Sequence, residues 1–94
     1  MLIQNTKKID LTTIDLGIEA DNAILTKLPS TSISEDAKAA WVHEINADIV
    51  RLQEMRPGYL DGRTEARHAR DTVVMLMNVS LISKFMNMIA EKKC

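Results

Sequence analysis

Residues 62–93, GRTEARHARDTVVMLMNVSLISKFMNMIAEKK, form the longest periodic stretch of this 94-residue sequence. The stretch contains no proline, and its single glycine stands at its start. Because proline and glycine are the residues that most often interrupt helices, their absence predicts one long helix from about Gly62 to Lys92. Asp61 can cap the beginning of this helix, and Lys92 and Lys93 complement its negative end.

The apolar residues of this predicted helix cover more of its circumference than one core requires. At about 100° per residue they span an arc of roughly 220°, whereas a helix on a single core needs a stripe of about 100° or somewhat more. The helix therefore needs more than one neighbour, and in so short a chain a neighbour can come from another molecule. The arc consists of Val74, Met75, Met77, Val79, Leu81, Ile82, Phe85, Met86, Met88 and Ile89.

Residues 33–56 are predicted to form a second helix with one apolar stripe. Ser32 and Glu35 have the spacing of a capping box, in which a hydroxyl and a carboxylate each satisfy a free backbone N–H. We expect this helix to end at Arg56, because Pro57 follows and the residue before a proline is disfavoured in the helical conformation. The stripe consists of Trp41, Val42, Ile45, Ile49, Leu52 and Met55.

The first segment of the chain gives a weaker helical pattern. Its apolar residues predict a helix from about Thr13 to Lys27, although Asp21 falls where the stripe needs an apolar residue and Gly17 lowers helix propensity. Alternation over residues 9–13 also permits a short extended piece, and we expect residues 1–8 to be loose. The apolar positions are Leu11, Ile14, Ile18, Leu25 and Leu28.

These elements predict an all-α fold in a single helical domain spanning residues 1–94. It has a three-helix architecture, with a long antiparallel helical hairpin formed by residues 33–56 and 62–92 and a shorter N-terminal helix. Folding the hairpin about Tyr59 places Ser34 near Lys84. We therefore expect the end of the last helix, Phe85, Met86, Met88 and Ile89, to project beyond the second helix, where the first helix or a second chain covers it.

Composition and charge argue against several classes of function. Twelve basic and thirteen acidic residues give a net charge of −1, which suits neither a basic nucleic-acid coat nor an acidic mimic of DNA. The single cysteine, Cys94, has no partner for an internal disulfide. The N-terminal residues lack the apolar centre of a signal peptide, and polar residues from Asn78 to Asn87 interrupt the apolar stretch of the last helix too often for a membrane span. We expect a cytoplasmic protein with no membrane partner.

No catalytic pattern is present in the sequence. There is no glycine-rich phosphate loop and no nucleophile elbow. His43 and His68 lie on different predicted helices, so the paired histidines of a helical metal motif are absent, and His43 has no carboxylate three or four residues away. We therefore expect no enzymatic activity, no metal site and no cofactor.

Arg63, Arg67 and Arg70 have a four-then-three spacing that aligns them on one helical face. Three interpretations are open: pairing within the chain, contact with an acidic protein partner, and binding of nucleic-acid phosphates. In the predicted hairpin Asp48 lies opposite Arg70, and Asp48 falls within an apolar arc where an unpaired carboxylate is costly. This favours an ion pair between Asp48 and Arg70.

Asn78 lies near the middle of the apolar arc of the last helix. A buried asparagine in such a seam can specify register and oligomeric state, while an exposed one bonds locally or to water. Four methionines share the same helix, and methionine-rich surfaces adapt to partners of different shape. Together with the wide apolar arc, this pattern favours an interface over a purely internal core.

The sequence therefore predicts a non-enzymatic helical protein-interaction module of the adaptor, chaperone or inhibitor type. It would bury its long C-terminal helix against a protein partner or, by self-association, against a second copy of the chain. The alternative is a small nucleic-acid-binding regulator, a dimer that uses the arginines together with His68. The expected partner-binding residues are Arg63, Arg67, Arg70, Met77, Asn78, Leu81, Phe85, Met88 and Ile89.

Overall fold

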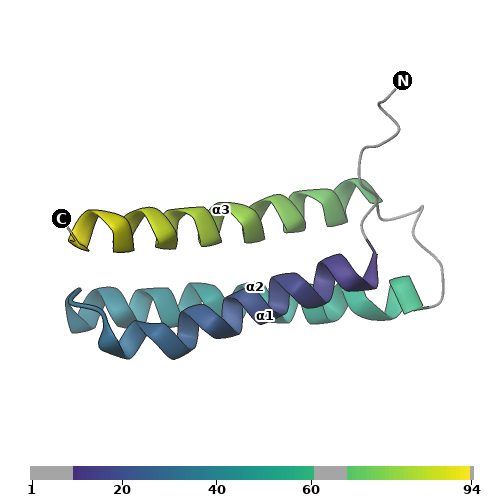
Figure 1. Cartoon of the computed structure of the whole chain (residues 1–94). Coiled ribbons are helices and arrows are strands. Elements are labelled where there is room, and N and C mark those ends of the chain that lie inside the picture. Colours follow the sequence, from purple (N-terminus) through teal and green to yellow (C-terminus); the bar gives the residue numbers. More distant parts are fainter. Residues whose placement is uncertain (1–9, 61–67, 94) are drawn as a thin grey trace, which may run out of the picture.

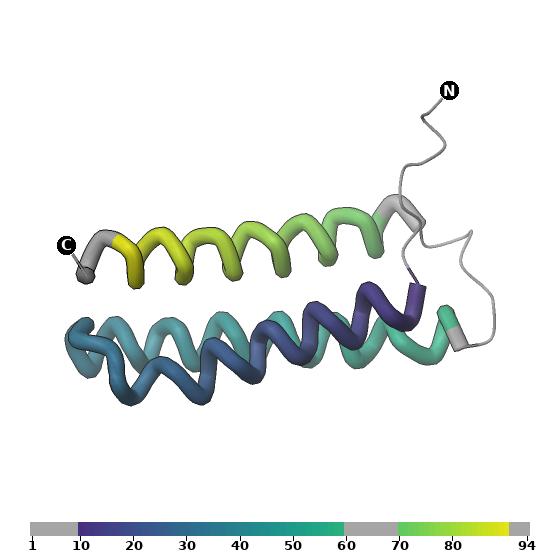
Figure 2. Tube along the Cα trace, in the orientation of Figure 1, coloured from purple at the N-terminus to yellow at the C-terminus, as the bar shows by residue number. Residues whose placement is uncertain are grey.

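The computed structural model describes residues 10–60 and 68–93, and they form three α-helices that pack on one another (Figure 1). Helix α1 spans Leu11–Lys27, α2 spans Glu35–Leu60 and α3 spans His68–Lys93, with the short 3-10 helix η2 at Leu28–Ser30 between the first two. Each helix contacts the other two, and α2 runs opposite to α1 and α3 (Figure 2). The predicted all-α, three-helix architecture is confirmed.

Helix α1 begins two residues before the predicted start because Asp10 caps it. One Asp10 carboxylate oxygen accepts hydrogen bonds from the backbone N–H and the hydroxyl of Thr13, both at 2.9 Å. The alternative extended piece is therefore wrong over Leu11–Thr13, which are helical. At the other end the chain tightens into η2, where Thr31 N–H donates to the carbonyl of Leu28 at 3.0 Å and turns the chain towards α2.

The residue that caps α2 is Ser34, where the sequence pattern had suggested Ser32. The Ser34 hydroxyl accepts from the backbone N–H of Ala37 at 3.1 Å. The predicted end of this helix is also wrong, since α2 continues through Pro57 to Leu60. Pro57 removes one backbone hydrogen bond from the helix. The last turn gains a contact with α3 that offsets this loss, because the Tyr59 hydroxyl donates to Asp71 Oδ2 at 2.8 Å.

An ion pair ties α1 to the second half of α2. The Arg56 guanidinium donates to both oxygens of Asp15, at 2.8 and 3.0 Å. This two-pronged pair is mutually supporting, because the guanidinium lowers the pKa of Asp15 and the carboxylate raises the pKa of Arg56. Its partly exposed position limits its contribution to stability.

The buried apolar residues form two separate clusters along the bundle. The first cluster lies towards the start of α1, and the second lies towards the end of α1. A layer of polar side chains lies between them and is described below. The first cluster contains Ile14, Leu52, Met55 and Val74, and the second contains Ile24, Leu28, Ile45 and Phe85.

The register of the α2–α3 hairpin differs from the predicted one. Trp41 meets Phe85 edge to face with ring centroids 5.3 Å apart, and Asp48 meets Asn78 at 2.8 Å. Position 63 lies midway between the residues of each pair, so the hairpin is centred there and not at Tyr59. The shift follows from the continuation of α2 to Leu60.

The register shift corrects the expectation that Phe85 projects beyond the second helix. Phe85 is 3% exposed and packs in the cluster of Ile24, Leu28 and Ile45, so α1, η2 and α2 cover it. Three further predictions, the Asp61 cap, the start of the last helix at Gly62 and loose residues 1–8, lie outside the described residues.

Candidate functional site

The predicted partner-binding residues fall into three groups in the structure. Asn78 and Phe85 are buried within the chain, while Leu81, Met88 and Ile89 are half-buried against the second apolar cluster. Met77 and Arg70 are exposed on α3. Arg63 and Arg67 lie outside the described residues, so the predicted arginine row is represented there by Arg70 alone.

The apolar surface of α3 includes two residues that the sequence pattern missed. Val73 is 56% exposed and Leu76 is 63% exposed, and both lie beside Met77, which is 41% exposed. The three residues fall on one side of the helix by their spacing, and we call them the α3 strip. The signal in the sequence was the unbroken apolar run itself: residues 73–77 leave no polar position for the solvent side of a helix.

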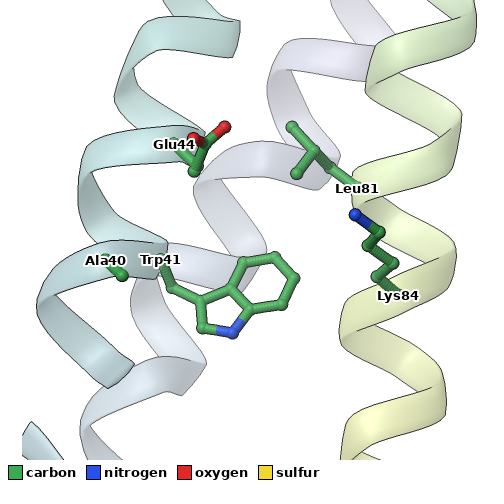
Figure 3. Close-up of a pocket in the computed structure, with 5 residues that line it drawn as sticks. All are labelled: Ala40, Trp41, Glu44, Leu81 and Lys84. Atoms are coloured by element: carbon green, nitrogen blue, oxygen red, sulfur yellow. The ribbon is translucent and has the colours of Figure 1, made fainter. Parts of the chain in front are cut away.

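The α3 strip borders a groove between α2 and α3. One hollow of about 320 Å³ is lined by Ala40, Trp41, Glu44, Leu81 and Lys84, whose side chains project from the two helices into the space between them (Figure 3). A second hollow of about 350 Å³ shares three of these residues. We call the continuous depression the α2–α3 groove. The lining of the second hollow is Glu44, Arg51, Val73, Leu76, Met77, Ser80, Leu81 and Lys84.

The α2–α3 groove combines an apolar floor with charges of both signs. Glu44 of α2 and Lys84 of α3 are exposed at its walls. Arg51, seven residues along α2 from Glu44, is 30% exposed and lines the second hollow. An apolar centre surrounded by polar and charged groups is the usual composition of a protein-binding surface.

A polar layer crosses the centre of the bundle and receives one side chain from each helix. Asp21 of α1 and Asp48 of α2 are 0% exposed, and Asn78 of α3 is 2% exposed. The Asn78 amide nitrogen donates to Asp48 Oδ2 at 2.8 Å, to Asp21 Oδ1 at 3.3 Å and to the Gly17 carbonyl at 3.4 Å. We call Asp21, Asp48 and Asn78 the polar layer.

The two carboxylates of the polar layer have different electrostatic surroundings. Asp48 Oδ1 accepts from Arg51 Nη2 at 3.1 Å, so a cation compensates its charge. Asp21 Oδ2 is buried without a hydrogen-bond partner among the described atoms. Burial, followed by the neighbouring Asp48, raises the pKa of Asp21 to about 8. Burial beside a second carboxyl group therefore favours the protonated form of Asp21.

The polar layer also corrects the predicted ion pair between Asp48 and Arg70. Asp48 binds Arg51 and Asn78, whereas Arg70 is exposed at the first turns of α3. The changed hairpin register is the reason, because it places Asn78 opposite Asp48. Asn78 lies in a seam, as its position in the apolar arc indicated, and its contacts are with helices of its own chain.

The described residues offer no cluster of three or more His, Cys, Asp or Glu side chains that could hold a metal ion. His43 is exposed on α2. Comparisons with protein-family models, curated proteins and solved structures found no match to this chain.

Within the described part of the chain, one helical segment is long and apolar enough to cross a membrane. It is Arg70–Ala90, 21 residues with a mean hydropathy of 1.6, and 22% of it is buried in the bundle. Core helices of bundles meet the same two criteria. In this structure the segment carries Asn78, whose amide contacts two carboxyl groups.

Proposed function

We propose that the protein is a helical interaction module that self-associates through the α3 strip and the α2–α3 groove. The observation that carries this proposal is the exposure of Leu76, 63%, in the middle of a strip that adjoins a groove. Large apolar residues gathered beside a groove mark surfaces that bind other chains, whereas single scattered ones do not. Met77 adds a flexible side chain that can adapt to a partner.

A second copy of the chain is the partner whose charges fit the groove. Glu44 and Arg51 lie seven residues apart on α2, about 10 Å at 1.5 Å per residue. Two copies related by a two-fold axis present the same patch to each other in opposite directions. Arg51 of each copy then meets Glu44 of the other, with the α3 strips between the two pairs.

The nucleic-acid alternative receives less support. It depends on a row of arginines, of which Arg63 and Arg67 lie outside the described residues and Arg70 is exposed. The net charge of −1 provides no general attraction for phosphates.

The test is the oligomeric state of a variant carrying Leu76→Asp and Met77→Asp, measured by size-exclusion chromatography with light scattering over a range of concentrations. Both side chains are exposed, so their replacements stay solvated in the monomer and helix content is retained. In the dimer they would be buried without partners, at a cost of several kcal/mol. We expect dissociation to be favoured by a factor of about 100 or more.

Val50→Asp is the matched control for this experiment. Val50 is 50% exposed on α2 and does not line either hollow of the groove. The control should associate as the original chain does. A chain that is monomeric at every concentration, or a double variant that associates normally, contradicts the proposal.

A further inference from the structure

The two carboxyl groups of the polar layer lie between the two apolar clusters, where α3 covers the contact between α1 and α2. Figure 1 shows α1 and α2 packed as a pair, with α3 lying along them. Asp21 and Asp48 come from the paired helices, and Asn78 brings the covering helix onto both. If α3 left this position, water would reach the two carboxyl groups.

We propose that the polar layer is a proton-dependent latch, which holds α3 on α1 and α2 while Asp21 carries a proton beside Asp48, and releases α3 when that proton is lost. The proton resides on Asp21, whose Oδ2 is buried without a hydrogen-bond partner among the described atoms. It leaves to solvent base, and the two negative charges that remain face each other in a dry core.

The charged groups around the polar layer favour release of α3 on loss of the proton, and not on its gain. From α2, Asp48 disfavours ionisation of Asp21, and Arg51 favours it to a smaller extent. From α3, Asn78 supplies an uncharged amide, and its nearest described titratable neighbours on that helix, Asp71 and Lys84, are seven and six residues away. One cation therefore faces two carboxyl groups, so one carboxylate charge is compensated and a second is not.

The sign of the pH effect follows from the raised pKa of Asp21. Between its ordinary value of 3.8 and about 8 the folded chain binds one more proton than the unfolded chain. The stabilisation is complete at low pH and is lost as pH rises to about 8. For one proton, the equilibrium constant for opening rises about tenfold per pH unit across this window.

Helix α3 is the element that leaves, because α1 and α2 share more contacts with each other than either shares with α3. Since α3 forms one wall of the α2–α3 groove, opening of the latch also dismantles that groove. This last consequence rests on the proposed function; the latch itself does not.

The fluorescence of Trp41 reports whether α3 is docked on the other two helices. It is the single tryptophan of the chain, and its ring packs on Phe85 of α3. We would record Trp41 fluorescence and far-ultraviolet circular dichroism from pH 5 to about pH 10. In the original chain we expect the emission to shift to longer wavelength as the pH rises towards about 8 and to level off above it, while most of the helical signal remains.

Asp21→Asn removes the titratable group while keeping the shape of the neutral side chain, and Glu19→Gln is its matched control. Glu19 is an exposed carboxylate on the same helix. The fluorescence transition should disappear in Asp21→Asn and persist in Glu19→Gln. Arg51→Gln removes the cation that favours ionisation, so its transition should move to higher pH. This last variant tests the latch even if Asp21→Asn does not fold.

Three results would overturn the latch: no transition in the original chain, an unchanged transition in Asp21→Asn, or loss of the helical signal together with the fluorescence change. The titration is repeated in the Leu76→Asp, Met77→Asp variant. If that variant is monomeric and keeps the transition, the latch works without association. If the original chain proves monomeric, the proposed function fails and the titration still decides the latch.

Discussion

Gly17 is the residue on which the closeness of α1 and α3 depends. A Cβ atom placed on it would lie 3.1 Å from Asn78 Oδ1 and 3.3 Å from the Leu52 side chain. Contacts this short require the neighbour to move by a few tenths of an ångström. Asn78 has little freedom to move, because its amide is held by Gly17, Asp21 and Asp48. The glycine therefore lowers local helix propensity while permitting the polar layer to close.

We expect Gly17→Ala to destabilise the fold, although alanine favours a helix over glycine by about 1 kcal/mol. Displacing Asn78 weakens its hydrogen bond to the charged Asp48, and bonds to charged groups contribute about 1.5–3 kcal/mol. Urea unfolding would show a net loss of about 1 kcal/mol. Asn22→Ala, at an exposed position of the same helix, is the control and should gain a few tenths. A more stable Gly17→Ala variant would show that the contact is not tight.

The members of the polar layer were each visible in the sequence, but their meeting was not. Asp21 interrupts an apolar stripe, Asp48 falls within another, and Asn78 lies in the centre of the widest arc. Helical periodicity gives the angle of a residue around its helix, and for all three residues this angle lies within an apolar stripe. It does not give the position of one helix along another. The hairpin register, and with it the partner of Asp48, depended on where α2 ends.

The position at which α2 ends explains why the predicted hairpin register and the predicted partner of Asp48 are wrong. A proline normally marks the end of a helix, and for this reason the sequence predicts that α2 ends at Arg56. Packing overrides this local preference, because the turn beyond Pro57 carries Tyr59 to Asp71. The three helices themselves were predictable from periodicity and composition. The sequence predicts only Met77 of the α3 strip, because Val73 and Leu76 lie outside the apolar arc that faces the core.

The corrected register makes Phe85 a core residue of the hairpin and not a contact for another chain. Phe85→Ala should cost about 3–5 kcal/mol of unfolding free energy, because a large buried side chain is removed beside Trp41. Met86→Ala, at a neighbouring position that is 63% exposed, should change stability by less than about 0.5 kcal/mol. Denaturant unfolding of the two variants measures this difference. A Phe85→Ala variant that keeps its stability but loses association would restore the original interpretation.

Along its length the bundle consists of two apolar clusters separated by a layer of three buried polar side chains. Burying carboxyl groups is costly, and replacing buried ionic groups by apolar ones of similar size is often neutral or stabilising. Hydrogen bonds of fixed geometry, however, are satisfied in one alignment only. Sliding α3 by one turn would leave Asp21 and Asp48 without Asn78, whereas apolar contacts tolerate such a slip. The polar layer can therefore specify the alignment at the expense of stability.

This division predicts the behaviour of a variant in which Asp21, Asp48 and Asn78 are all replaced by valine. Valine is the apolar residue nearest in size, and Arg51 is exposed enough to turn its charge towards water. We expect the free energy of unfolding to rise by about 1–4 kcal/mol and its pH dependence between pH 4 and 8 to disappear. The Trp41 indole N–H should give several NMR signals in place of one, because α3 can now pack in more than one register. A triple variant that is less stable than the original chain would mean that the layer contributes net stability. A single sharp indole signal in a more stable variant would mean that the apolar clusters alone fix the register.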